Sequence, residues 1–195
     1  MVAAIIGLVL LSPVILIIAI AVAVDSGFPV FYRAERAGRQ GRSFWILKFR
    51  SMRSAAPNEG SHHSGDDDPR ITRVGRVMRR FKLDELPQLV NVLIGHMSLV
   101  GPRPETLEYI KLYTDAEMII LSVRPGITDY ASIEFADLGS ILAGGDPDEI
   151  YFEKVWKPKM ELRIKYVNEH SFFGDMRLIF LTFKAAVVPS RNKTG

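Results

Sequence analysis

The chain opens on the stretch VAAIIGLVLLSPVILIIAIAVAV, residues 2–24, which holds no charged residue in 23 positions. A helix rises about 1.5 Å per residue, so this stretch reaches roughly 34 Å and is long enough to cross a hydrocarbon core of about 30 Å. Three structures fit it: a cleaved signal peptide, a transmembrane helix, and a hairpin that enters and leaves the membrane on one side. The signal peptide is disfavoured because the apolar run is too long for one.

Ser12 and Pro13 lie in the middle of this stretch. Proline removes a backbone donor and clashes with the carbonyl four residues earlier, that of Val9. A serine hydroxyl beside the proline can bond the freed backbone group, which tolerates a sharp bend. A bend is typical both of a hairpin and of a kinked transmembrane helix, so the residues alone leave these two structures open.

The segment that follows, residues 28–53, is strongly basic. It carries seven cations against the single acid Glu35; the cations are Arg33, Arg36, Arg39, Arg42, Lys48, Arg50 and Arg53. Basic flanks remain on the cytoplasmic side of a membrane, next to its anionic leaflet. We therefore expect everything after residue 25 to be cytosolic.

Composition excludes several classes of protein. The chain has 195 residues, of which 48% are hydrophobic and 24% charged, so it is long enough for one folded domain with an appendage and is not disordered. It has no cysteine, which excludes disulfide frameworks, zinc ribbons, iron–sulfur clusters and cysteine nucleophiles. The four histidines are scattered and no glycine-rich nucleotide loop is present.

Hydrophobic periodicity predicts an α+β fold that is mainly helical. We expect strands at residues 28–32 and 43–49, and helices at 74–81, 84–93, 105–123, about 147–168 and 172–188. The helix at 74–81 is amphipathic, and the one at 172–188 mixes apolar and charged residues. This last helix suits either the membrane interface or a protein core.

A basic run followed by two acids carries the strongest chemical signal. Six cations fall within residues 70–82 with no acid among them, and Asp84 and Glu85 come directly after. Because Pro87 is tolerated only in a first helical turn, we place Asp84 at or near a helix N-cap, where it should stay ionised. An ionised carboxylate among phosphate-binding groups can attack phosphorus, although an ordinary capping role and a lipid-binding basic face fit the same residues.

Two rigid loops each present one arginine. They are the Gly-Pro-Arg-Pro loop around Arg103 and the Arg-Pro-Gly loop that begins at Arg124. Proline and glycine fix the backbone in both, so each arginine suits a phosphate group, with plain turn formation as the alternative.

Four motifs in one order resemble the bacterial sugar transferase family, the small monotopic phosphoglycosyl transferases. They are KFRSM at residues 48–52, LDELPQL at 83–89, MSLVGPRP at 97–104 and VRPGIT at 123–128. The resemblance covers most of the chain.

The resemblance implies the reaction and its residues. Members transfer a sugar 1-phosphate from a UDP-sugar to undecaprenyl phosphate, release UMP and need Mg²⁺. The mechanism is ping-pong, through a covalent phosphosugar on the first acid of the dyad. Here the matching catalytic residues are Asp84, which is also the expected metal ligand, and its partner Glu85. The matching phosphate-binding residues are Lys48, Arg79, Arg103 and Arg124.

The resemblance also implies the membrane arrangement. Residues 1–25 would form a re-entrant membrane helix hairpin broken at Ser12 and Pro13. Residues 26–195 would form a small cytosolic catalytic domain with interfacial amphipathic helices, on the cytoplasmic face of the bacterial inner membrane. Expected partners are the UDP-sugar, undecaprenyl phosphate and membrane phospholipid, with no nucleic acid, and a homodimer is left open. The alternative class is a non-enzymatic, membrane-anchored basic module that binds anionic lipid or nucleic acid.

The chain departs from the family pattern at two places. His96 stands where many members have an aspartate, and residues 129–135 replace a common glycine- and tryptophan-containing segment. We therefore carry over no preference for a particular sugar.

Overall fold

The computed structural model describes residues 1–53 and 65–187. Its α-helices are α1 (Val2–Ser26), α2 (Arg73–Arg80), α3 (Gln88–Leu93), α4 (Leu107–Ile110), α5 (Tyr130–Glu134), α6 (Leu138–Ile141), α7 (Pro147–Ile150), α8 (Lys157–Glu169) and α9 (Phe172–Val187). Its strands are β1 (Phe31–Ala37), β2 (Ser43–Phe49), β3 (Ser98–Val100) and β4 (Gly126–Thr128). The prediction of an α+β fold that is mainly helical is confirmed.

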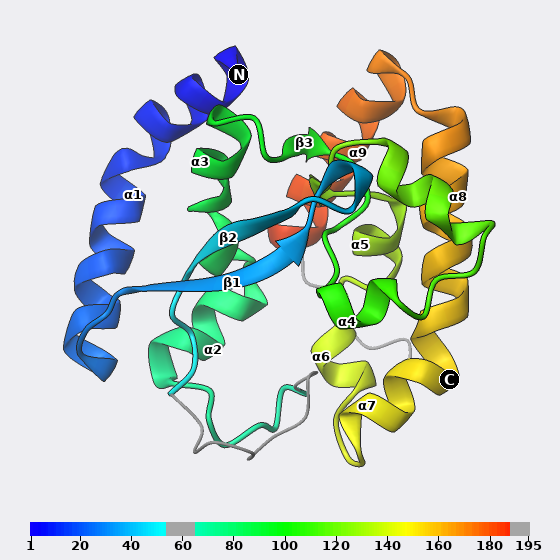
Figure 1. Ribbon diagram of the computed structural model, residues 1–195. Coiled ribbons are helices and arrows are strands. Elements are labelled where there is room, and N and C mark those ends of the chain that lie inside the picture. The colour runs from blue at the N-terminus through cyan, green and yellow to red at the C-terminus, as the bar shows by residue number, and fades with distance from the viewer. Residues whose placement is uncertain (54–64, 188–195) are drawn as a thin grey trace.

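Two small sheets lie among the helices. β1 and β2 form an antiparallel hairpin in which Phe31 pairs with Phe49 and Ala37 pairs with Ser43. β3 and β4 form a parallel pair. Figure 1 shows the β1–β2 hairpin reaching from α1, on one side of the molecule, toward β3, with α8 on the opposite side. The hairpin therefore connects α1 to the half that contains β3 and β4.

Helix α1 is continuous through Pro13 and is bent (Figure 1). The Ser12 hydroxyl donates a hydrogen bond of 2.8 Å to the carbonyl of Val9. This is the carbonyl that loses its normal partner because of Pro13, so the predicted compensation is confirmed. Within the described part of the chain, α1 is the one helix whose length and composition would let it cross a membrane.

Helix α1 packs against the rest of the chain near both of its ends. Ala4 is fully buried in a cluster formed with residues of β1, β2, α3 and the segment that precedes β3. Ile18 and Val22 are buried in a second cluster with Phe49 and Met78. The helix is thus part of the hydrophobic core as well as an apolar surface.

A buried amide joins β2 to α3. The Asn91 side chain accepts a hydrogen bond of 2.9 Å from the backbone N–H of Leu47 and donates one of 2.8 Å to the carbonyl of Trp45. It therefore satisfies the backbone groups on the edge of β2 that β1 leaves free. Lys48 follows Leu47 directly, so this clamp also fixes where Lys48 lies.

The expected helix over residues 105–123 is wrong. The segment instead forms α4, an intervening turn and a 3-10 helix at Glu117–Ser122. The reason is a capping box: the backbone N–H and the hydroxyl of Thr114 both donate to the Glu117 carboxylate, at 2.7 and 2.9 Å, and the Thr114 hydroxyl accepts from the Glu117 N–H. This pair begins a new helical segment and interrupts the long one.

The other predicted elements are confirmed in place, with changes at their ends. The first strand is the exception: the sequence predicts it at 28–32 and it lies at Phe31–Ala37, so the prediction is correct only for Phe31 and Tyr32. The long helix begins at Asp146, whose carboxylate caps α7 as expected, and continues through a π-helical segment at Tyr151–Trp156 into α8. Most of the predicted loop at 54–69 lies outside the described residues, as do His62 and His63.

Replacing Asn91 with alanine should destabilise the fold. The change leaves a partly buried backbone donor and a partly buried acceptor of β2 without their partner, which we expect to lower the free energy of unfolding by about 2 kcal/mol. Thermal unfolding of the detergent-solubilised protein measures this loss. Asn168→Ala, at an exposed position of α8, is the matched control. Equal melting temperatures for the two variants would show that the clamp contributes nothing.

Candidate active site

Asp84 and Glu85 lie in a 3-10 turn at Leu83–Glu85 rather than at the cap of a helix. Lys82, directly before the turn, has a left-handed backbone with φ of 56° and redirects the chain that leaves α2. The residue at the start of α3 is Pro87. Asp84 thus lies near a helix N-cap, in a first helical turn as expected, but the capping positions themselves are held by Lys82 before the 3-10 turn and by Pro87 before α3.

Glu85 forms salt bridges with two cations that come from distant segments. Its Oε1 lies 3.0 Å from Nζ of Lys48, on β2. Arg103, in the loop after β3, donates from Nη1 to Oε2 at 2.6 Å and from Nη2 to Oε1. These salt bridges thus join three of the four motifs that carry the family resemblance, and the pairing of β3 with β4 adds the fourth.

The two cations determine the ionisation of Glu85. Burial alone would raise the pKa of Glu85, but the charges of Arg103 and Lys48 and their hydrogen bonds outweigh it and hold this pKa well below its ordinary value. The same pairing raises the pKa of Arg103. Glu85 is therefore ionised at neutral pH.

Asp84 lies in a different electrostatic environment. It is 9% exposed, and within residues 1–53 and 65–187 its carboxylate has neither a hydrogen bond nor a salt bridge. Burial and the neighbouring charge of Glu85 raise the pKa of Asp84, and the charges of Lys48, Arg79 and Arg103 offset this only in part. The sequence predicts that a nearby helix N-cap keeps Asp84 ionised, but the capping positions beside it are held by Lys82 and Pro87. A carboxylate that is more basic and unpaired is a better nucleophile than a paired one.

The other two predicted arginines lie in different positions. Arg79, on α2, is partly buried, its Nη1 lies 3.4 Å from Sδ of Met52, and its charge lowers the pKa of Asp84. Arg124 is exposed in the loop before β4, and in the described ranges it forms no salt bridge with Glu85. The structure therefore places Arg79 near the dyad and leaves Arg124 outside its ion pairs.

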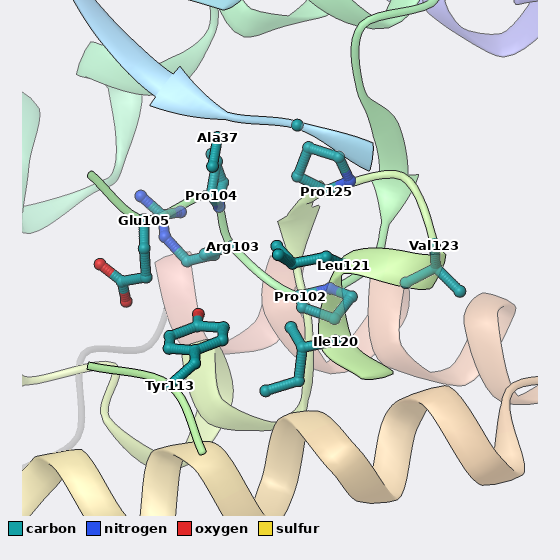
Figure 2. A pocket seen from close by; sticks show the side chains of 11 residues that line it. Ala37, Pro102, Arg103, Pro104, Glu105, Tyr113, Ile120, Leu121, Val123 and Pro125 are labelled. Carbon is teal, nitrogen blue, oxygen red and sulfur yellow. The ribbon is translucent and has the colours of Figure 1, made fainter. Parts of the chain in front are cut away.

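A small, mainly apolar cavity lies along the Arg103 loop. Figure 2 shows Pro102, Ile120, Leu121 and Pro125 lining it, with Arg103, Glu105 and Tyr113 at one side. Asp84 and Glu85 do not line it. We therefore assign this cavity to the support of the loop rather than to the chemistry.

The site offers one carboxylate to a metal ion, so the remaining ligands of such an ion would come from the substrate. No group of three or more His, Asp or Glu side chains that could hold a metal occurs in the described part of the chain. Both oxygens of Glu85 are occupied by cations, which leaves the Asp84 carboxylate as the available ligand. Mg²⁺ is often held by one or two carboxylates together with substrate phosphates, so the site suits it only with the substrate present.

Sequence reasoning missed the buried polar residues that hold the site. Asn91 and Arg163 were not predicted, and Asp129 was noted only as a departure from the family pattern. A signal existed for Asp129, since the spacing Asp129-x-x-Ser132 is typical of a helix N-terminus. Arg163 has no local signal, because its partners lie far away in the sequence.

The family model for bacterial sugar transferases matches residues 1–189. The chain belongs to the bacterial sugar transferase family. The prediction of an enzyme is thereby confirmed, and the alternative of a non-enzymatic basic module has no support in the site, where Lys48 and Arg103 pair with Glu85.

Relatives of this transferase differ in length. The chain is 37% identical over 177 residues to the uncharacterized sugar transferase EpsL of Bacillus subtilis, covering 91% of this chain and 79% of that protein. It is 38% identical over 184 residues to the UDP-glucose:undecaprenyl-phosphate glucose-1-phosphate transferase of Escherichia coli, covering 92% and 38%. It is 36% identical over 186 residues to the UDP-N-acetylgalactosamine-undecaprenyl-phosphate N-acetylgalactosaminephosphotransferase of Aeromonas hydrophila, covering 93% and 41%. The chain thus spans well under half of the last two relatives.

The Glu85 salt bridges should make the stability of this transferase depend on pH. Because the folded pKa of Glu85 is lowered, its contribution is complete above the unfolded value of 4.5 and is lost as the pH falls below that value. In Glu85→Gln the contribution is absent at every pH. We therefore expect the difference in melting temperature between wild type and Glu85→Gln to be large at pH 7 and to shrink below pH 4.5.

The exposed residue Glu153 provides the control for this measurement. Glu153→Gln should differ little from wild type across the same pH range. A gap between wild type and Glu85→Gln that stays constant from pH 7 to pH 3.5 would contradict the ion-pair assignment.

Proposed function

We propose that this protein transfers a sugar 1-phosphate from a UDP-sugar to undecaprenyl phosphate and releases UMP. Support comes from the relatives in E. coli and A. hydrophila, whose names give UDP-linked donors and undecaprenyl phosphate as acceptor. The named donors differ in their sugars, glucose in one and N-acetylgalactosamine in the other. The proposal therefore concerns the phosphoryl transfer, and we place it in the assembly of a bacterial surface glycan or glycoconjugate.

One observation carries the proposal: two adjacent acids have opposite environments. Glu85 is neutralised by Lys48 and Arg103, whereas Asp84 is buried, unpaired among the described residues and raised in pKa. An acid with these properties, close to cations that can receive a diphosphate, is suited to nucleophilic attack at phosphorus. We assign that role to Asp84.

The transfer takes two displacements. In the first, a carboxylate oxygen of Asp84 attacks the sugar-linked phosphorus of the donor and forms an aspartyl O–P bond. The bond from this phosphorus to the bridging oxygen of the diphosphate breaks, and UMP leaves with that oxygen. In the second, a phosphate oxygen of undecaprenyl phosphate attacks the same phosphorus and the aspartyl bond breaks, which returns Asp84 as a carboxylate. The covalent intermediate removes the need to hold both substrates together.

The cations around the dyad position the acids and receive the phosphates. Lys48 and Arg103 fix Glu85, and the remaining N–H groups of Arg103 are free to face a phosphate. Arg79 adds positive charge near Asp84. We assign to Arg124, on the exposed loop before β4, a contact with a more distant part of the donor.

Mg²⁺ is the proposed cofactor. Asp84 and the donor phosphates would hold it, and the ion would neutralise the charge that develops on the departing UMP.

The same proposal places α1 as a re-entrant helix on the cytoplasmic face of the inner membrane. Ala4 and Val22 are about 27 Å apart along a straight helix, yet both are buried against the same globular part of the chain. A helix that crossed the bilayer would carry one of these residues to the far side, away from its packing partners. The basic segment after residue 25 assigns the cytoplasmic side. The bend at Pro13 and the Ser12 hydrogen bond fit either arrangement, so the shared packing of Ala4 and Val22 is what favours entry and exit on that side.

Helix α9 supplies a second surface for the membrane. One side of this helix exposes large apolar residues, namely Phe172, Phe173, Met176, Phe180 and Phe183. The side chains recur three or four residues apart and so form one face. We propose that this face lies among membrane phospholipids, which would set the dyad near the headgroup level where the acceptor phosphate resides.

Removing the proposed nucleophile should abolish turnover. In Asp84→Asn the attacking oxygen is lost while the size of the side chain is kept, so we expect release of UMP from a UDP-sugar, with Mg²⁺ and polyprenyl phosphate, to fall by roughly a thousandfold or more. The melting temperature should stay close to that of the wild type. Asp115→Asn, at an exposed position, is the matched control.

Mass spectrometry gives the decisive result for this proposal. Wild type incubated with donor alone should carry a sugar phosphate on Asp84, and Asp84→Asn should carry none. Normal turnover in Asp84→Asn, or product formation without any adduct on Asp84, would exclude the mechanism.

The orientation of α1 can be tested with single cysteines, since the chain has none of its own. Val2→Cys and Arg33→Cys place one thiol at an exposed position before and one after the apolar stretch. We expect a membrane-impermeant reagent to label both from the cytoplasmic side of inverted vesicles and neither from the outside of intact spheroplasts. Labelling from opposite sides would show that α1 crosses the membrane.

A further inference from the structure

Arg103 is held at its backbone as well as at its guanidinium. Besides the bonds to Glu85, Nη1 donates to the carbonyl of Ile127 at 2.9 Å. The backbone N–H of Arg103 donates to Oδ2 of Asp129 at 3.3 Å. The position of Arg103 thus depends on the segment at residues 127–129 that begins in β4.

Asp129 caps α5 and, unlike an ordinary capping residue, is completely buried. Its Oδ1 accepts from the N–H and the hydroxyl of Ser132, at 2.7 and 2.6 Å, and so begins α5. Asp146 caps α7 in a similar way but is exposed to solvent. Asp129 is 0% exposed, and complete burial of a carboxylate is costly unless its charge is paired and its oxygens are hydrogen-bonded.

The charge that pairs with Asp129 comes from α8. Nε of Arg163 lies 3.7 Å from Oδ2 of Asp129, and Arg163 is 1% exposed. Nη1 of Arg163 also donates to Glu105 at 2.8 Å, and Glu105 is only two residues after Arg103. The buried Arg163 therefore connects Asp129, which bonds the backbone of Arg103, to Glu105 at the end of the Arg103 loop.

Glu105 is fixed from further directions. Lys159 donates to its Oε1 at 2.6 Å, and its backbone carbonyl accepts from the N–H of Ala37, at the end of β1. The loop that carries Arg103 is thus attached to β1, to β4 and to α8. Such attachment restricts movement of the loop backbone and thereby of the guanidinium that it carries.

We propose that Asp129 is a positioning residue for Arg103, with Arg163 as its buried counter-charge. The inference rests on the proposed function, because the placement of Arg103 matters for transfer only if the Glu85 cluster serves the reaction. It also gives a role to Asp129, the first residue of the segment in which this chain departs from its family. A displacement of Arg103 by about 1 Å would weaken its double contact with Glu85, and errors of that size can cost up to a hundredfold in rate.

A double-mutant cycle tests the inference on the full chain in membranes or detergent. The variants are Asp129→Ala, Arg103→Ala and the two combined, with kcat/KM for UMP release as the measurement. We expect Asp129→Ala to lower kcat/KM by about tenfold or more in the wild-type background and to have little further effect once Arg103 is absent. A merely structural loss of the α5 cap would reduce activity to the same extent in both backgrounds.

Two further variants keep the test decisive. Asp146→Ala removes an equivalent cap far from the dyad, so it should lower the melting temperature and leave kcat/KM unchanged. Asp129→Asn keeps the size of the side chain and an oxygen for the α5 cap, so it replaces Asp129→Ala in the cycle if the alanine variant does not fold. We expect the same non-additivity with Arg103→Ala.

The outcomes distinguish a failure of the positioning role of Asp129 from a failure of the proposed transfer reaction. Wild-type activity in Arg103→Ala would remove Arg103 from the proposed active site and overturn the inference with it. A large loss in Arg103→Ala, together with an Asp129 effect that is equal in both backgrounds, would overturn the inference alone. An Asp129 variant that loses only stability, as Asp146→Ala should, would also overturn it.

Discussion

The carboxylate of Glu85 is the point at which three separate parts of the chain meet. Lys48 reaches it from β2 and Arg103 from the loop after β3, while Glu85 itself lies in the turn before α3. Two partly buried cations that lie close together repel each other, and the negative charge of Glu85 between them offsets this repulsion. Much of the polar interior serves this arrangement: Asn91 fixes the strand that carries Lys48, and Asp129 contacts the backbone of Arg103.

In the proposed mechanism, the two neighbouring acids meet different requirements. A carboxylate that organises cations must be strongly paired, and pairing lowers its basicity. A carboxylate that attacks phosphorus must have an oxygen without a partner. Placing both acids in one tight turn lets Glu85 pair with the cations, while Asp84 has no ion pair with any residue that the structure describes and still interacts with the charges of the cations. The left-handed backbone at Lys82 is the local deviation that brings this turn into position.

Local sequence patterns predicted the elements whose stability is local. The apolar stretch, the amphipathic period of α2 and the alternation of β2 are each set by residues close in sequence. The helix expected at 105–123 failed because Thr114 and Glu117 bond each other and begin a new segment. The environment of Asp84 could not be read locally, since it depends first on burial within the folded chain and then on charges that include Lys48 and Arg103, which are 36 and 19 positions away. The family resemblance identified Lys48 and Arg103 as candidates. It did not identify the buried residues that position them, Asn91, Asp129 and Arg163.

Helix α1 shares its packing with the catalytic part of the molecule, since Ala4, Ile18 and Val22 each complete a cluster whose other members come from later in the chain. A helix of this kind is also one side of the hydrophobic core. Cutting it away would not release a water-soluble enzyme but would uncover Phe49 and Met78 along an open flank. Replacing α1 by an unrelated membrane segment would therefore also remove part of the hydrophobic core. Changes in α1 are constrained by the stability of the fold as well as by membrane attachment.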